Sequence, residues 1–486
     1  MRIPKLACGR SAVFATLLTL TLVLGAVAAP TAAPVDPKKK AAAAKRAPGK
    51  QAPAKQAPTK QTQAKQNKAA ATKKPTTTAR STTSKPPGRR TVAIYRQVRR
   101  PVYYAPTFSP EDREATVQWI NENMAPQQET FENVRGLVPF FELLYQSARS
   151  KTPVHVLHYG DSHTASDDFP NSLREQFQSR FGNGGPGFSL AGSPFPGYRR
   201  HDLEAYHSSN TWITEGVLTR RGNGMNGLGG VSITSNRPGD TVQMTATGEQ
   251  SELLFLQQPE GGDFEVWADD NLLGTVSTQG ELQPATLPLI ETPGEHKYLF
   301  KTLTANPVRL FGTVIQNKSG VTWETMGING AQATMLADWD PQILEAHLAK
   351  RNPALIVLAY GTNEANYPNF DAREYAKGLR TVLSRLRKGA PLASILIVGP
   401  PDCRVKNLDA VISVQIEVAH QMGAAFWHWR DHMGGAGSMP QWVASGLAQG
   451  DNIHLTTSGY QLVGRTLAEE LLIQYQRFVT ARMETE

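Results

Sequence analysis

A serine, a histidine and an aspartate lie in two segments of the 486-residue sequence from which they could together perform nucleophilic catalysis. Ser162 lies in GDSH (160–163), directly after the apolar run VHVLHY, and Asp451 and His454 lie in DNIH (451–454). A serine hydroxyl becomes a nucleophile when a base accepts its proton, and an acid must hold that base in the right tautomer. Within one turn, a spacing of three lets the Asp451 carboxylate reach Nδ1 of His454 while Nε2 faces outward. We therefore predict Ser162 as the nucleophile, His454 as the base and Asp451 as the acid that orients it.

Acyl transfer also needs hydrogen-bond donors at the place where the oxyanion forms. The candidates are the backbone N–H of Ser162, the backbone N–H of Gly330 in GINGAQ (327–332) and the side-chain amide of Asn363 in GTNE (361–364). A glycine at position 330 lets the backbone approach a substrate with no Cβ in the way. The segments that carry these residues follow apolar runs that read as strands, and ligands bind at the carboxyl ends of strands in open α/β sheets. We therefore expect the segments to meet at one edge of a sheet.

In this order, the four segments resemble those of the SGNH/GDSL hydrolase superfamily, over residues 160–182 and 321–475. The resemblance implies a serine esterase that uses the nucleophile, oxyanion donors, base and acid named above and needs no cofactor. His163, where many relatives have leucine, the insertion in the middle of the domain and the phrase MGGAGSMPQW look more specifically like the peptidoglycan O-acetylesterase branch. In that branch the inserted module resembles a carbohydrate-binding jelly roll, which implies an acetylated glycan as substrate.

Two residues beside the nucleophile and one histidine pair are candidates for further roles. Asp161 is expected to brace the turn through local hydrogen bonds. His163 is expected to be structural or to line the substrate, and not to act as a base, because His454 already has a paired acid. Asp161 and His163 are thus both candidates for lining the substrate site. His428 and His432 are four residues apart, a spacing that can bind a metal on a helix. The aromatic run around them is typical of a strand and no third ligand is evident, so we expect no metal site.

Short apolar runs alternate with longer amphipathic segments in the parts of the chain that carry the candidate residues. The runs VHVLHYG, PALIVLAYG and SILIVGPP read as buried strands, and FPNSLREQFQSRFG and DAREYAKGLRTVLSRLRKG read as helices. Strands that are apolar throughout are typical of a parallel sheet covered on both faces. We expect a three-layer α/β fold of the SGNH type, with a flavodoxin-like parallel sheet and helices on both faces.

Residues from about 206 to 318 show a different pattern, with short alternating runs separated by turn signals at intervals of about ten residues. This pattern predicts an antiparallel β-sandwich, jelly-roll-like, inserted into the α/β domain. Its aromatic residues Trp212, Trp267 and Tyr298 either stack on sugars or are ordinary core or surface residues. The predicted domain limits are 101–190 for the first part of the hydrolase domain, 191–320 for the insert and 321–486 for the second part.

The N-terminal region reads as a leader followed by a tether. Residues 1–29 combine a basic start, an apolar run and a small-residue cleavage site, which predicts a secretory signal peptide, or a membrane anchor if it is not cleaved. Residues 30–100 are rich in Lys, Ala, Pro and Thr and predict a disordered tether, because they hold few side chains that could build a core. Removal of the leader leaves Cys403 as the one cysteine, so no internal disulfide is expected.

The charge of the chain is divided between the tether and the folded body. Residues 1–100 hold 22 of the 51 basic residues and one of the 42 acidic residues, so the other 386 residues have 29 basic and 41 acidic side chains. Nucleic-acid enzymes usually carry their positive charge on the folded surface, so we expect no nucleic-acid partner. The basic tether is either a solvated spacer or a polycation that binds an anionic cell-envelope polymer.

These observations favour an exported serine esterase, in the periplasm or cell envelope, that removes O-acetyl groups from a cell-wall polysaccharide, with peptidoglycan the expected one. A polysaccharide O-acetyltransferase would use the same triad, with a sugar hydroxyl in place of water. A wall-binding protein with a vestigial site is the remaining alternative, which the complete set of candidate residues argues against.

Overall fold

The computed structural model of the protein describes Gln118 and residues 131–484. The predicted signal peptide or anchor (1–29) and the predicted basic tether (30–100) lie outside the described residues. Within the described part of the chain, no helix combines the length and the apolar character needed to span a bilayer.

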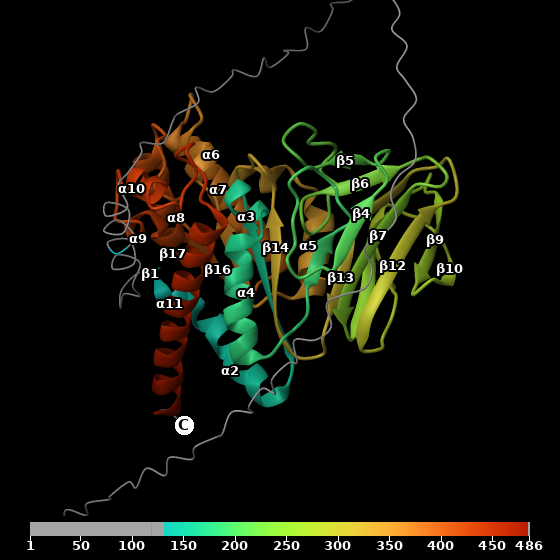
Figure 1. Ribbon diagram of the computed structural model, residues 1–486, viewed down its shortest axis with the longest axis horizontal. Coiled ribbons are helices and arrows are strands. Elements are labelled where there is room, and N and C mark those ends of the chain that lie inside the picture. The colour runs from blue at the N-terminus through green and yellow to red at the C-terminus, as the bar shows by residue number, and fades with distance from the viewer. Residues whose placement is uncertain (1–117, 119–130, 485–486) are drawn as a thin grey trace, which may run out of the picture. The chain divides into compact units, whose positions relative to one another are not determined.

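Six strands form one sheet in the order β1-β17-β16-β15-β2-β14 (Figure 1). All neighbours pair in parallel except β1, which is antiparallel to β17. Numbered along the chain, the five parallel strands have the spatial order 2-1-3-4-5, which is the flavodoxin-like order. That order reverses at β2, between β14 and β15. The strands are β1 (Phe131–Glu132), β2 (Pro153–Gly160), β14 (Gly320–Gly327), β15 (Leu355–Ala359), β16 (Ser394–Val398) and β17 (Ala425–Trp427).

Two groups of helices flank this sheet, and within each group the helices pack on one another (Figure 1). Strands β15 and β16 are buried along their whole length, as expected for strands covered on both faces. The side chains of Asp340 and Asp371 cap the starts of α5 and α7 by accepting backbone N–H groups. The predicted three-layer α/β fold is confirmed. One group is α2 (Val138–Ser150), α4 (Asp168–Phe181) and α11 (Thr457–Met483), and the other is α5 (Pro341–Arg351), α7 (Ala372–Gly389) and α8 (Leu408–Met422).

Short helices follow the carboxyl ends of several parallel strands. α3 (Ser162–Ala165) follows β2, α6 (Thr362–Ala365) follows β15 and α9 (Trp429–His432) follows β17. The carboxyl edge of the sheet is therefore built from tight turns, which bring residues distant in sequence close together. The other short elements are η1 (Val134–Leu137), η2 (Ala333–Asp338) and α10 (Met439–Ala444).

Antiparallel strands between α4 and β14 form two further sheets. Their orders are β10-β9-β12-β7-β4 and β11-β8-β13-β6-β5, and β3 also pairs with β13. Side chains from both sheets share a second hydrophobic core, with Val242, Phe264 and Phe300 from the first sheet and Leu253 and Leu310 from the second. The predicted inserted β-sandwich is confirmed. The strands are β3 (Gly187–Leu190), β4 (Ala205–Ser208), β5 (Ile213–Glu215), β6 (Ser232–Ser235), β7 (Thr241–Gly248), β8 (Gln250–Gln257), β9 (Asp263–Ala268), β10 (Asn271–Ser277), β11 (Gln283–Pro288), β12 (Gly294–Thr302) and β13 (Val308–Gln316).

Strand pairing shows where the chain passes between the two cores. β3 pairs with β13 of the insert, so the predicted start of the insert at residue 191 lies just after a strand that already pairs within it. β14 pairs with β2 along its whole length, from Gly320 paired with Pro153 to Gly327 paired with Gly160. The chain therefore returns to the parallel sheet at β14.

The aromatic residues of the insert are mainly core residues. Trp212 and Tyr298 are 9% and 1% exposed and belong to the core between its two sheets. Neither ring is therefore available as a sugar-stacking platform. Trp267 is half-buried, and its indole N–H donates to Oε2 of Glu265 at 3.1 Å.

Candidate active site

The corner between β2 and α3 presents the predicted nucleophile. Ser162 is the first residue of α3, and Asp161 before it caps the turn by accepting the backbone N–H of His163 at 2.9 Å. The corner is tight, because a Cβ added to Gly160 would lie 2.0 Å from Oγ1 of Thr164. Glycine is therefore required where β2 ends. The half-buried Ser162 lies at the carboxyl edge of the sheet, where the strand order reverses and α/β folds bind ligands.

Ser162, His454 and Asp451 form a continuous hydrogen-bonded series, although Ser162 and His454 are 292 positions apart. Oγ of Ser162 lies 2.9 Å from Nε2 of His454, and Nδ1 of His454 lies 2.7 Å from Oδ2 of Asp451. The other oxygen of Asp451, Oδ1, accepts the backbone N–H groups of Ile453 and His454 at 2.9 and 3.0 Å. The carboxylate is thereby held in one orientation, with one oxygen on the backbone and one on the imidazole.

The Asp451 carboxylate stays charged at neutral pH. Partial burial acts against the charge, but the hydrogen bonds from the His454 ring and from the backbone N–H groups of His454 and Ile453 lower the pKa of Asp451 to about 2. A charged carboxylate keeps the proton of the neutral imidazole on Nδ1, which leaves Nε2 free to accept the Ser162 proton. The side chains of Asp451 and His454 are 32% and 29% exposed, so water can reach the base.

The loops after β14 and β15 meet beside the Ser162 corner. Nδ2 of Asn363 donates to the carbonyl oxygen of Ala331 at 3.0 Å and to Oδ2 of Asp161 at 3.2 Å. Gly330, next to Ala331, has a φ of +77°, which glycine adopts without strain. The segments that carry the three predicted oxyanion donors are therefore brought together. Both amide hydrogens of Asn363 have a protein acceptor here, so its donation to an oxyanion stays a prediction.

Comparisons with known proteins agree with this geometry. A model of the GDSL-like lipase/acylhydrolase family matches residues 298–462, which include Gly330, Asn363, Asp451 and His454. A solved structure described as "Peptidoglycan O-acetylesterase in action, 5 min" matches with a TM-score of 0.61 and 29% sequence identity, over 70% of this chain and 96% of that chain. The chain belongs to the SGNH hydrolase superfamily. As a member, it is a carboxylic ester hydrolase.

Weaker similarities extend to other esterases. Family two carbohydrate esterases from Clostridium thermocellum, solved with cellohexaose, and from Cellvibrio japonicus share 14% and 13% identity with this chain. The matches cover 51% and 57% of this chain and 95% and 99% of theirs, each with a TM-score of 0.24. Similarity at this level says nothing about the substrate of the present hydrolase. No curated protein matches the sequence.

His163 and Asp161 are internal residues of this SGNH hydrolase, at 2% and 1% exposure. Nδ1 of His163 hydrogen-bonds with the Tyr460 hydroxyl at 2.9 Å, and Nε2 with Oγ1 of Thr362 at 3.2 Å. Burial, and next the nearby charge of His454, lower the pKa of His163 to about 3, so its ring is neutral. Of the predicted roles, lining the substrate site is therefore wrong for both residues, because neither borders an open surface, while the structural role of His163 and the turn-bracing role of Asp161 agree with these contacts. Sequence reasoning missed Thr362 and Tyr460, which no motif connects to His163.

Two buried carboxyl groups lie under the loops of the site. Burial raises the pKa of Asp161 to about 7 and that of Glu364 to about 8. Oε1 of Glu364 accepts the backbone N–H of Ala333 at 2.7 Å, which ties the loop after β14 to α6. Burial without a cationic partner thus leaves both groups ready to take up a proton near neutral pH.

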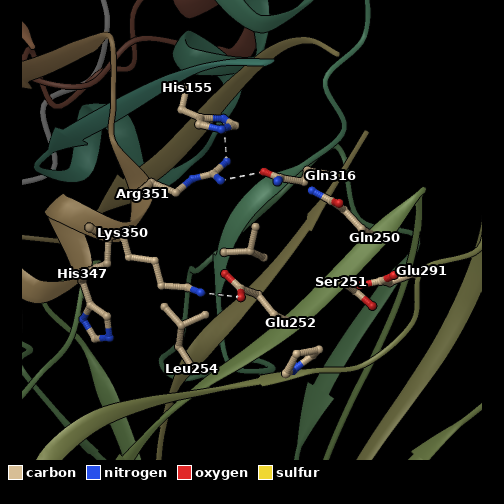
Figure 2. A pocket seen from close by; sticks show the side chains of 13 residues that line it. His155, Gln250, Ser251, Glu252, Leu254, Glu291, Gln316, His347, Lys350 and Arg351 are labelled. Carbon is tan, nitrogen blue, oxygen red and sulfur yellow. Dashed lines mark hydrogen bonds and ion pairs between the residues drawn. The ribbon is translucent and has the colours of Figure 1, made fainter. Parts of the chain in front are cut away.

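A polar pocket of about 300 Å³ lies between α5 and the insert (Figure 2). Ser251, His155 and His347 line it, so it contains the residue types of a nucleophile and a base. The hydroxyl of Ser251, however, accepts from the Tyr298 hydroxyl at 2.9 Å, and no described histidine hydrogen-bonds with it. His155 lies near the start of β2, whereas Ser162 follows its end. The pocket is therefore separate from the hydrolase site and lacks its hydrogen-bonded series.

The predicted absence of a metal site concerns His428 and His432. Nε2 of His432 lies 2.7 Å from Oε1 of Glu470, and Nε2 of His428 lies 3.4 Å from Oε1 of Glu132. The two rings therefore face different carboxylates. Within residues 131–484, no group of His, Cys, Asp and Glu side chains has an arrangement that could hold a metal ion.

Proposed function

We propose that the protein is an exported serine O-acetylesterase that removes acetyl groups from peptidoglycan. The observation that carries the proposal is the hydrogen-bonded series of Ser162, His454 and Asp451 beside the loops of Gly330 and Asn363. The substrate class is supported by the similarity to the structure of a peptidoglycan O-acetylesterase, at 29% identity over 96% of that chain.

Acylation begins when Oγ of Ser162 attacks the carbonyl carbon of the acetyl ester and Nε2 of His454 takes the hydroxyl proton. The Asp451 carboxylate stabilises the imidazolium that forms. The backbone N–H groups of Ser162 and Gly330 and the amide of Asn363 hold the oxyanion. The ester C–O bond then breaks, His454 gives its proton to the departing sugar oxygen, and an acetyl group remains on Ser162.

Deacylation repeats the sequence with water in place of the serine hydroxyl. Nε2 of His454 takes a proton from water, the hydroxide oxygen attacks the acetyl carbon, and acetate leaves as Ser162 regains its proton. The 29% exposure of the His454 side chain supports this step, because solvent has a direct route to the base. All the groups that this cycle uses are protein side chains, backbone N–H groups and water.

The N-terminal sequence supports a location in the cell envelope. Residues 1–29 direct export, and residues 30–100, which hold most of the 22 basic residues of the first hundred positions, bind an anionic polymer of the cell envelope. The acidic body then remains free to approach its substrate while the tether keeps it in the wall. Binding of a peptide of residues 30–100 to purified anionic wall polymer, and its loss at high salt, tests this part separately.

The proposed activity is tested by acetate release from O-acetylated peptidoglycan and from a small chromogenic acetyl ester. Ser162→Ala should lower both rates by roughly 10³-fold or more, because the nucleophile is removed. Ser166→Ala, which removes another hydroxyl directly after α3, is the matched control and should retain activity. Equal rates for the Ser162→Ala variant and the wild type would refute the mechanism. Transfer of acetyl groups to added bare glycan, with no free acetate, would instead identify an acetyltransferase.

A further inference from the structure

The insert touches the oxyanion loop, residues 328–331, which carries the predicted donor Gly330. Residues 216–220 of the insert form a tight turn, closed by a backbone hydrogen bond of 2.8 Å between its first and last residues. Leu218 lies at the tip of this turn and is 51% exposed. A Cβ added to Gly330 would lie 2.9 Å from Cδ2 of Leu218, so this methyl group packs directly against the glycine.

Gly330 has little support from its own loop. Its φ of +77° lies in the region that glycine adopts freely, and within residues 131–484 its N–H has no protein acceptor. The hydrogen bonds of the loop hold the next residue instead. The N–H of Ala331 donates to the carbonyl oxygen of Ile328 at 3.0 Å, and its carbonyl oxygen accepts from Asn363 at 3.0 Å. A free N–H can donate to an oxyanion, but contacts from outside the loop are needed to fix its direction.

The turn is itself firmly held by the rest of the insert. A Cβ added to Gly216 would lie 1.9 Å from the carbonyl oxygen of Gly230, so the start of the turn packs on neighbouring backbone. Arg309 of β13 reaches both sides of the turn, because its Nη2 pairs with Oε2 of Glu215 at 2.6 Å and its Nη1 donates to Oδ1 of Asn223 at 2.8 Å. The leucine at the tip is thus presented from a fixed support.

Other contacts join the insert to the same edge of the sheet. A Cβ added to Gly197 of the insert would lie 3.1 Å from Nδ2 of Asn329 in the oxyanion loop. The hydroxyl of Tyr159, near the end of β2, donates to the carbonyl oxygen of Leu228 in the insert at 2.9 Å. The insert therefore contacts both the oxyanion loop and the strand that leads to the nucleophile.

We propose that Leu218 is a positioning residue of the hydrolase site, an inference that rests on the oxyanion role proposed for Gly330. Its side chain limits the movement of the oxyanion loop, so that the Gly330 N–H stays directed at the oxygen of the acyl group. The inserted sandwich is thereby a structural part of the catalytic unit, and this role needs no contact between the insert and the substrate.

Leu218→Ala tests this role by removing the methyl group that packs on Gly330. Burial of about half of a leucine side chain shifts an equilibrium roughly 3- to 10-fold, so kcat for a small chromogenic acetyl ester should fall by roughly that factor. KM should change by less than about twofold, because an oxyanion donor acts mainly in the transition state. Leu218→Met keeps an apolar side chain of similar volume and should restore kcat to within about twofold of the wild type.

Leu272→Ala is the matched control. Leu272 is also a leucine of the insert and is 50% exposed, but it lies on β10, the strand at the outer edge of its sheet, away from the hydrolase site (Figure 1). Its replacement should leave kcat and KM unchanged. An unchanged kcat in Leu218→Ala, or the same loss in both variants, overturns the proposal.

Esters of different acyl length separate positioning from direct contact with the substrate. A misplaced oxyanion donor slows the hydrolysis of every acyl ester. Leu218→Ala should therefore lower the rates for the acetyl and butyryl esters of one chromogenic alcohol by the same factor. A rate for the butyryl ester that rises relative to that for the acetyl ester would make Leu218 a wall of the acyl site and overturn the positioning role.

Hydrogen–deuterium exchange tests the proposal apart from the proposed function. If the wild type releases acetate from neither peptidoglycan nor the chromogenic ester, the proposed function fails. The peptide that spans residues 328–332 should nevertheless exchange faster in Leu218→Ala than in the wild type and in Leu272→Ala, and equal exchange in the three proteins overturns the positioning role. If the ester is hydrolysed but peptidoglycan is not, the proposed substrate alone fails and the comparison of kcat values still decides.

Discussion

Replacing Asp451 by asparagine should inactivate the enzyme through the tautomer of His454. The two backbone N–H groups of Ile453 and His454 point at one oxygen of Asp451, at 2.9 and 3.0 Å. In Asp451→Asn the amide oxygen must stay on these donors, so the amide NH₂ faces Nδ1 of His454. The imidazole proton then moves to Nε2, and the ring can no longer accept the proton of Ser162.

The size of this effect follows from the same contacts. For Nδ1 of His454 to keep its proton, the amide in Asp451→Asn must turn so that its oxygen faces the imidazole. This orientation loses two backbone hydrogen bonds of about 0.5–1.5 kcal/mol each, so it is roughly 5- to 150-fold less populated than the other. Loss of the carboxylate also removes the charge that stabilises the imidazolium. The whole shift of the Asp451 pKa, from 3.8 to about 2, corresponds to about 2 kcal/mol, but it includes the two backbone hydrogen bonds as well as the one from His454. A pair whose side chains are 32% and 29% exposed contributes at most about 1 kcal/mol of it. Together the two effects should lower kcat roughly 30- to 10³-fold.

Asp451→Ser is the matched control for the tautomer. The serine hydroxyl can accept the same backbone N–H groups, and water fills the space beside Nδ1 and imposes no tautomer. This variant should therefore lose roughly tenfold less activity than Asp451→Asn. The assay is kcat on a saturating chromogenic acetyl ester, with thermal unfolding to confirm that both variants fold. An asparagine variant as active as the serine variant, or more active, would refute the reasoning.

Two further changes probe the loops of the site. Asn363→Ala should lower kcat roughly 10²- to 10³-fold, because an oxyanion donor acts in the transition state. KM for the chromogenic ester should change less than threefold. An unchanged kcat would show that Asn363 is not an oxyanion donor. Burial raises the pKa of Glu364 from 4.5 to about 8, so the folded state binds this proton more tightly than the unfolded chain and the wild type loses stability as pH rises through that range. Between pH 5 and 8, the melting temperature of Glu364→Gln should fall less with rising pH than that of the wild type, as measured by thermal scans. Parallel curves of melting temperature against pH for the two proteins would contradict the raised pKa of Glu364.

The sequence identified those residues of the site that lie close together in the chain or within a recognisable motif. Asp451 and His454 are three residues apart and lie on one turn, so their contact could be predicted from spacing alone. The apolar run before Ser162 predicted a buried strand, and the position of GDSH after it predicted a corner at the carboxyl edge. The alternation of the insert likewise predicted a sandwich, because a period of two indicates strands with one buried face.

Features that depend on long-range packing could not be predicted in this way. His163 contacts Tyr460 and Thr362, 297 and 199 positions away, and these contacts make it an internal residue. β3 joins the insert through pairing with β13, although it follows α4 directly in sequence. Trp212 and Tyr298 are core residues because they lie in the core that the two sheets of the insert share. Strand register and burial of this kind are decided by the whole fold.

The central claim, that Ser162 carries the acyl group, is tested most directly by trapping the intermediate. The wild type is mixed with a slowly hydrolysed ester or a serine-reactive phosphonate, and the modified residue is located by peptide mass spectrometry. The account predicts a single covalent adduct on Ser162, formed much more slowly in His454→Ala. An adduct on another serine, or steady ester hydrolysis with no adduct at Ser162 at any time, would contradict it.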